Sequence, residues 1–160
     1  MADHLEILSA AREGELAPIE EFFKQENATE LFKSIKNEYS LATPLHMAAA
    51  NAHVDVLKYI LHHLDENERA NIVNQKNDSG NTALHWAALT GSLESAQLLV
   101  GAGADAKIKN QAGFDSIYQA EVAENEALVE YFLKTVDFED EEEETISAGI
   151  PEEETKEKDV

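Results

Sequence analysis

The sequence repeats itself, and this internal repeat is the feature that most restricts how the chain can fold. The segment TPLHMAA at residues 43–49 recurs as TALHWAA at residues 82–88. A third copy, GFDSIYQA at 113–120, follows the pattern of GNTALHWA at 80–87, and AAREGEL at 10–16 falls in the same phase. The second copy starts 39 residues after the first, and the third follows 33 residues after the second. Repeats of this length are typical of solenoids, in which each unit buries apolar surface only against its neighbours. We therefore expect four units, the first of which lacks its front portion.

Each unit carries the signals of two short helices. The side-chain oxygen of a Ser, Thr or Asp can accept a free backbone N–H group at the start of a helix. In this chain the expected N-cap residues are Thr43, Thr82 and Asp115, and Pro44 stands where proline is tolerated, at a first helical position. Gly91 is expected to end a first helix. Apolar residues at helical spacing over 93–100 then indicate a second helix.

The residues TPLHxAA, followed by a Gly-His variant, Leu-Leu and Gly-Ala-Asp, resemble the ankyrin repeat over about residues 3–135. That resemblance implies an all-α solenoid of about four antiparallel helix pairs, with protruding hairpin fingers and a concave binding face. The spacing departs from the family's 33-residue period in two places, around residues 27–38 and 62–72. The first insertion holds Leu31, Phe32 and Ile35 at helical spacing. We expect each insertion to lengthen a helix end or to add a short helix without breaking the stack.

The composition restricts the partners of such a stack. The 160 residues carry 33 acidic and 12 basic side chains, a formal net charge of −21, and no cysteine. Disulfide bonds and cysteine zinc ligands are therefore excluded. Because this charge repels phosphate groups and anionic lipid surfaces, we expect neither direct nucleic-acid binding nor membrane binding. A partner recognised by its charge should be basic.

The acidic charge is concentrated in the last 24 residues. Residues 137–160 contain 12 acids against Lys156 and Lys158, and few apolar side chains that could form a core. We therefore divide the chain into an ankyrin-repeat domain, residues 1–136, and a disordered acidic tail, residues 137–160. The tail could serve solubility alone, or it could screen a basic surface on a partner.

No catalytic, cofactor-binding or metal-binding residue is predicted, and we do not expect an enzyme. His46 and His85 occupy the histidine position of the repeat, where the resemblance implies bonds to the N-cap threonine and nearby backbone. His62 and His63, together with Asp65 and Glu66, could suggest metal ligands, but adjacent histidines point to different faces of a helix. We therefore expect His62 and His63 to be solvated loop residues. The glycines of residues 101–103 follow a helix and not a strand, so they do not form a dinucleotide-binding loop.

The predicted partner-binding site is the face formed by the fingers and the first helix of each unit. Trp86 is the candidate anchor, because a large aromatic side chain can supply much of the binding energy of an interface; the alternative is that it packs between stacked helices. A basic, amphipathic segment, for instance a helix, would suit this face. The predicted binding residues are Glu38, Tyr39, Met47, Asn51, Asp78, Asn81, Trp86, Thr90, Phe114, Gln119 and Glu121.

Within the ankyrin family, the order of these motifs and the acidic tail are similar to those of fungal chaperones of the third protein of the small ribosomal subunit, here called S-three. This similarity implies a chaperone that binds and shields a basic client, S-three, before ribosome assembly, in the cytoplasm and the nucleus. We expect it to act as a monomer. The alternative is an ankyrin adaptor or scaffold that regulates a signalling, transcription or proteasome-assembly complex.

Overall fold

The computed structural model describes residues 3–136, and in this range it contains ten helices and no strand. The all-α ankyrin fold predicted from the repeats is confirmed. The predicted acidic tail, residues 137–160, lies outside the described residues. The helices are α1 (His4–Glu13), α2 (Leu16–Phe22), α3 (Ala28–Phe32), α4 (Pro44–Ala50), α5 (Val54–His63), α6 (Glu66–Val73), α7 (Ala83–Thr90), α8 (Leu93–Gly101), α9 (Ser116–Val122) and α10 (Glu126–Thr135).

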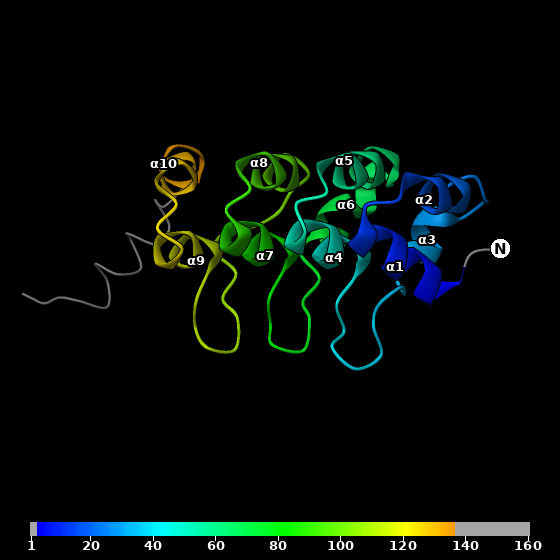
Figure 1. Cartoon of the computed structure of the whole chain (residues 1–160), viewed down its shortest axis with the longest axis horizontal. Coiled ribbons are helices and arrows are strands. Elements are labelled where there is room, and N and C mark those ends of the chain that lie inside the picture. The colour runs from blue at the N-terminus through cyan, green and yellow to red at the C-terminus, as the bar shows by residue number, and fades with distance from the viewer. Residues whose placement is uncertain (1–2, 137–160) are drawn as a thin grey trace, which may run out of the picture.

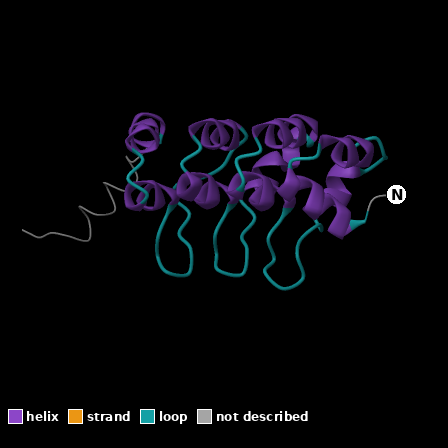
Figure 2. Ribbon diagram, in the orientation of Figure 1, coloured by secondary structure: helices purple, strands orange, loops and turns teal. Residues whose placement is uncertain are grey.

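The helices form two layers along one axis (Figure 1). The inner layer consists of α1, α4, α7 and α9, and each of these pairs with an outer helix: α2, α5, α8 and α10 respectively. Neighbouring inner helices pack directly against one another, α1 on α4, α4 on α7, and α7 on α9. Three long loops leave the inner layer on the side away from the outer helices (Figure 2). These loops are the fingers expected of ankyrin repeats.

Small residues allow the inner helices to approach closely. Ala48 and Ala49 of α4 and Ala87 and Ala88 of α7 are all fully buried. The outer helices contribute larger apolar side chains, such as Ile60, to the same core. Each large side chain that is fully buried stabilises the fold by about 1.5–3 kcal/mol relative to an exposed one. The core is therefore one continuous strip between the two layers.

The predicted capping residues begin and end the inner helices. Thr43, Thr82 and Asp115 are the N-cap residues of α4, α7 and α9, and each accepts a hydrogen bond from a backbone N–H group three residues ahead. Gly91 ends α7 in the left-handed conformation, with φ of 79°. All four predictions are confirmed.

Each insertion adds one short helix to the stack. The first contains α3, which ends at Phe32, so Ile35 lies beyond the helix although both side chains are buried. The apolar spacing thus predicted a helix that continues to Ile35, whereas the chain turns after Phe32 and buries Ile35 outside the helix. The second insertion contains α6, whose residues Ile72 and Val73 are buried. Neither insertion interrupts the contacts between successive inner helices.

Candidate partner-binding site

One asparagine near the start of each finger fixes the shape of that finger. Its side-chain oxygen accepts hydrogen bonds from two backbone N–H groups at distances of 2.9–3.0 Å. These residues are not among those predicted from the sequence, although the recurring Lys-Asn dipeptide at 36–37, 76–77 and 109–110 marks their positions. The three asparagines are Asn37, Asn77 and Asn110.

The histidines of the repeat connect each inner helix to the next finger. The Nδ1 atom of His46 accepts a hydrogen bond from the backbone N–H of Thr43 at 3.1 Å, and Nε2 lies 2.7 Å from the carbonyl oxygen of Asn81. Because a carbonyl oxygen can only accept, Nε2 carries the proton. His85 makes the same contacts, with Thr82 at 3.0 Å and with the carbonyl oxygen of Phe114 at 2.9 Å.

These contacts confirm that His46 and His85 have structural roles. Burial lowers the pKa of His46 to about 4, and the hydrogen bond to the Asn81 carbonyl raises it only in part. Burial likewise lowers the pKa of His85. Both rings are therefore neutral at physiological pH, and both nitrogens of each ring are occupied by partners within the stack.

Adjacent fingers are hydrogen-bonded to each other. The backbone N–H of Asp78 donates to the carbonyl oxygen of Ser40 at 2.8 Å, and the backbone N–H of Gln111 donates to the carbonyl oxygen of Ser79 at 2.9 Å. The side-chain amide of Gln111 also donates to the carbonyl oxygen of Asp78 at 2.9 Å. The three fingers thus form one connected edge, which limits the loss of conformational entropy when a partner binds.

The open side of the inner layer exposes apolar residues. Helix α7 is covered by α4 and α9 on its flanks and by α8 behind it, so its remaining side faces away from the outer layer. Leu89 is 47% exposed near the end of α7. Val122, at the corresponding place in α9, is 57% exposed, and Tyr39 in the first finger is 83% exposed. These side chains are available to a partner without any rearrangement.

The predicted binding residues divide by exposure. Trp86 and Met47 are half-buried and pack against the core, so the packing alternative holds for part of the Trp86 ring. The half-buried members of the set are Met47, Asn81, Trp86 and Gln119, and the exposed members are Glu38, Tyr39, Asn51, Asp78, Thr90, Phe114 and Glu121.

Glu121 does not share the surroundings of the finger residues. It lines a hollow together with residues of α10, an outer helix, whereas the fingers project from the opposite side of the inner layer. Glu38, Tyr39, Asp78, Asn81 and Phe114 lie on the fingers. The structure therefore brings the finger residues into one connected row and places Glu121 at a different surface.

The acidic charge of the described chain lies at its two ends. Residues 33–114 contain eight acids and seven bases and are nearly neutral. Residues 3–32 contain eight acids and two bases, and residues 115–136 contain five acids and one base. Lys36, Lys76 and Lys109 are exposed directly before the three finger asparagines, so Glu38 and Asp78 each have a lysine close by in the sequence. The middle repeats of the stack are thus nearly neutral, whereas its two ends are negatively charged.

The adjacent histidines occupy another place than the sequence predicted. His62 and His63 are the last residues of α5 and not part of a loop, because α5 extends to the insertion. Both are exposed, as predicted, but the His63 ring stacks on Tyr59 with centroids 3.9 Å apart. Within residues 3–136, no group of three or more His, Asp or Glu side chains is arranged to hold a metal ion.

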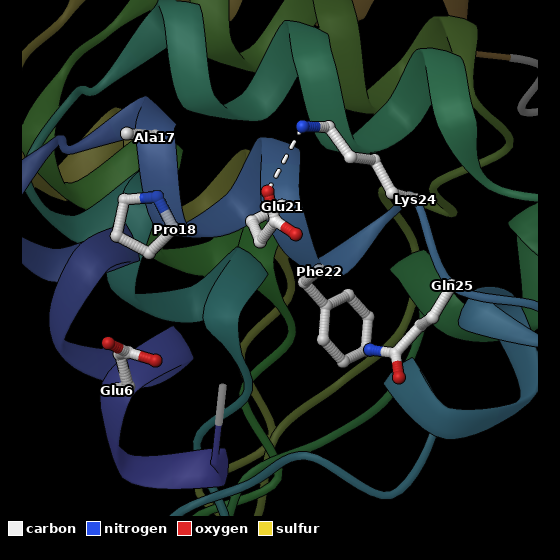
Figure 3. Close-up of a pocket in the computed structure, with 7 residues that line it drawn as sticks. All are labelled: Glu6, Ala17, Pro18, Glu21, Phe22, Lys24 and Gln25. Carbon is white, nitrogen blue, oxygen red and sulfur yellow. Dashed lines mark hydrogen bonds and ion pairs between the residues drawn. The ribbon is translucent and has the colours of Figure 1, made fainter. Parts of the chain in front are cut away.

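A hollow of about 750 Å³ lies at the N-terminal end of the stack (Figure 3). Glu21 and Lys24 form an ion pair of 3.0 Å in it, and Glu6 lies on the α1 side. The charged side chains of this hollow are Glu6, Glu21 and Lys24. It is lined by Glu6, Ala17, Pro18, Glu21, Phe22, Lys24 and Gln25.

Paired helices, capping Thr-His contacts and connected fingers define an ankyrin-repeat protein. Residues 7–110 match the family model described as ankyrin repeats in three copies, and the chain belongs to this family. None of the helices in residues 3–136 is long and apolar enough to cross a membrane.

Known proteins give more particular similarities. The chain is 40% identical over 150 residues to the ankyrin repeat-containing protein YAR1 of Saccharomyces cerevisiae, covering 89% of this chain and 75% of that protein. It also matches a chain in the crystal structure of the yeast ribosomal protein Rps3 in complex with its chaperone Yar1, with a TM-score of 0.78, 38% identity, and coverage of 84% and 93% of the two chains. Protein ACCELERATED CELL DEATH 6 of Arabidopsis thaliana is 36% identical over 110 residues, 61% of this chain but 16% of that protein.

Proposed function

We propose that this chain is a dedicated chaperone of a basic small-subunit ribosomal protein of the Rps3 type, the protein called S-three above. The similarity to YAR1 over 89% of the chain carries this proposal. The match to a chain of the Rps3–Yar1 complex supports it, because that match extends over most of both chains. The chaperone acts by binding, without catalysing a reaction.

Such a chaperone would shield the positive charge of its client. A ribosomal protein that binds RNA carries a basic surface, which attracts polyanions before the protein reaches its place in the ribosome. The acidic ends of this chain, together with the 12 acids of residues 137–160, supply negative charge that such a surface can bind instead. In this proposal, Tyr39, Leu89 and Val122 cover apolar parts of the client between the charged ends.

The test is an aggregation assay with purified full-length chain and purified Rps3. The chain should prevent the light scattering that Rps3 develops at low salt, and the complex should form in a pull-down at moderate ionic strength. Association should weaken as salt increases, because screening reduces attraction between exposed charges. No complex at moderate ionic strength would overturn the proposal. Binding of other proteins that persists at high salt would instead support the adaptor alternative.

A matched pair of variants tests which face binds the client. Leu89→Ser removes an exposed leucine from the inner-helix face, and Leu31→Ser removes one of similar exposure, 42% against 47%, from α3. Because neither side chain belongs to the buried core, both variants should fold. We expect Leu89→Ser to weaken client binding about fivefold to tenfold and Leu31→Ser to leave it unchanged. Equal effects would show that the client does not use the inner-helix face.

The cellular part of the proposal is that the chaperone meets its client in the cytoplasm and accompanies it to the nucleus as a monomer. A fluorescent fusion should be found in both compartments, and depletion of Rps3 should reduce the nuclear fraction. Light scattering of the purified chain should give the mass of one copy.

A further inference from the structure

The C-terminal end of the stack exposes positions that are covered in the preceding repeats. Counted from the N-cap of each outer helix, Val129 of α10 corresponds to Leu57 of α5 and Ala96 of α8, which are both fully buried. Val129 itself is half-buried. Leu133 corresponds to Leu61, which is 6% exposed, and to Val100 of α8, which is half-buried, yet Leu133 itself is 61% exposed. Because α8 packs against α5 and α10 packs against α8, the free side of α10 is where a further helix would stack.

Carboxylates surround these apolar residues. Val129 and Leu133 line a hollow of about 400 Å³, and every charged side chain that lines this hollow is a glutamate. We call it the C-terminal hollow, and it is lined by Glu121, Glu124, Asn125, Glu126, Val129, Glu130 and Leu133. Its chemistry combines aliphatic surface with negative charge.

A polar cap on a solenoid accounts for only part of this surface. Terminal repeats usually present a polar outer side that keeps the stack soluble, and the glutamates serve that purpose. However, Leu133 remains largely exposed among them. Tyr118, at the position where His85 of α7 reaches the next finger, is also exposed and stacks on Phe114 with ring centroids 4.3 Å apart. The C-terminal end of the stack thus presents apolar groups together with carboxylates.

We propose that the C-terminal hollow is a second docking site, which takes a basic amphipathic helix of a partner protein. The aliphatic face of that helix packs on Val129 and Leu133, as α10 packs on α8. Its lysine or arginine side chains then lie beside the glutamates, so the attraction adds to the apolar contact. This site is separate from the fingers, and it extends the proposed function, in which the acidic ends attract a basic client, by assigning one end a helical ligand of defined chemistry.

The negative charge around the C-terminal hollow favours a basic helix over the other possible occupants. Residues 115–136 contain five acids and one base, so a basic helix is attracted. The chain's own residues 137–160 carry 12 acids and two bases and are repelled from the same surface. A second copy would bring identical glutamates face to face, which is unfavourable for the same reason.

The first test compares two leucine variants of the full-length chain. The probe is a synthetic amphipathic helical peptide, labelled with a fluorophore, with leucines on one face and lysines on the other. Leu133→Ser removes the exposed leucine of the hollow, and Leu5→Ser, the matched control, removes a leucine that is 72% exposed on α1 at the other end. We expect Leu133→Ser to weaken peptide binding about tenfold, and Leu5→Ser to change it less than about twofold.

The second test compares two pairs of glutamates. Glu121→Gln with Glu130→Gln removes two charges from the hollow, and Glu20→Gln with Glu21→Gln removes two from α2. The pairs are matched, because Glu130 forms an ion pair with Lys134 at 3.2 Å and Glu21 forms one with Lys24 at 3.0 Å. We expect the first double variant to bind the peptide about fivefold more weakly than the second.

Equal losses in the two double variants would mean that the peptide responds only to overall charge, and this would overturn the proposal. Wild-type affinity of Leu133→Ser would overturn it as well. In methyl NMR spectra, the signals of Val129 and Leu133 should shift when the peptide is added, and unchanged signals would contradict the assigned location. A failure of the chain to bind Rps3 would overturn the proposed function while leaving these peptide results unaffected.

Discussion

The Nε2 atom of His46 donates a hydrogen bond of 2.7 Å to the carbonyl oxygen of Asn81, a residue of the next repeat. The same ring accepts a hydrogen bond from the backbone of Thr43, at the N-cap of its own helix. One imidazole therefore connects the start of α4 to the finger that precedes α7. The bond from the Thr43 backbone requires an unprotonated Nδ1, and the bond to Asn81 requires a proton on Nε2, so the two bonds together belong to the neutral ring.

The stack should therefore lose stability in mild acid. The pKa of His46 is lowered to about 4 in the folded chain, whereas an unfolded histidine has a pKa of about 6.5. The unfolded chain thus binds a proton first, and the contribution of His46 is complete above pH 6.5 and decreases as the pH falls toward 4. This contribution amounts to about 3 kcal/mol between pH 7 and pH 4.

Carboxylates also titrate in this range, so the measurement compares wild type with His46→Gln. The free energy of unfolding, obtained from urea denaturation followed by circular dichroism, should fall more steeply with decreasing pH in the wild type. Parallel pH profiles of the two proteins would contradict the role assigned to His46.

The fingers should respond unequally to the same glycine substitution. Gly80 and Gly113 both have φ near 80–90°, so alanine strains either backbone by about 1–2 kcal/mol. A Cβ atom at Gly80 would also lie 2.9 Å from the backbone nitrogen of Gln111 in the next finger, whereas at Gly113 it would meet open space. We expect Gly80→Ala to lower the free energy of unfolding by at least about 1 kcal/mol more than Gly113→Ala. Equal losses would mean that the fingers move apart without cost.

Substitutions at the C-terminal ends of α4 and α7 should change the free energy of unfolding in opposite directions. Ala52 adopts the left-handed conformation, with φ of 55°, at the position that Gly91 occupies in the next repeat. Ala52→Gly should raise the free energy of unfolding by about 0.5–1 kcal/mol, since glycine adopts this conformation without strain. Gly91→Ala should lower it by more than about 1 kcal/mol, because the new Cβ would lie 2.6 Å from the side-chain nitrogen of Asn125. Thermal unfolding of both variants tests this prediction, which changes of equal sign would contradict.

Two fully buried serines should also differ. The Ser116 hydroxyl is buried at the start of α9 without a hydrogen-bond partner, whereas Ser95 accepts a hydrogen bond of 2.8 Å from the hydroxyl of Ser92. Removing an unsatisfied hydroxyl should be favourable, so Ser116→Ala should stabilise the chain by about 1 kcal/mol. Ser95→Ala should destabilise it by about 0.5–1.5 kcal/mol. A destabilised Ser116→Ala variant, measured by urea denaturation, would show that this hydroxyl makes a bond in solution.

The repeat pattern predicted the parts of the fold that depend on neighbouring residues. The N-caps Thr43, Thr82 and Asp115 and the helix end at Gly91 follow from local chemistry, and the structure confirms each of them. The packing of Ile35 was beyond such reasoning, because this residue is buried after its helix has ended. Tertiary contacts and not helical spacing determine its position.

The sequence predicted the position of each candidate binding residue within its repeat, but not which elements surround that residue in the structure. Tyr39 and Asp78 lie on the connected fingers as expected, whereas Glu121 lies against α10. The repeat register places a residue on a helix, but it does not say whether another repeat covers that helix. Only the end of the stack makes the sides of α9 and α10 accessible, and this is why the exposure of Leu133 could not be derived from the period alone.

The separation of charge along the stack has a consequence for the way a client arrives. Residues 3–32 and 115–136 are each negatively charged, and the repeats between them are nearly neutral. At physiological ionic strength, charges are screened over about 8 Å, so the two ends attract a basic surface separately. In the proposed function, a client with two separated positive patches would therefore be favoured in the orientation parallel to the stack axis, whereas a client with one patch could approach at either end. In that case, attraction to the charged ends of the stack orients the client first, and the client contacts the fingers afterwards.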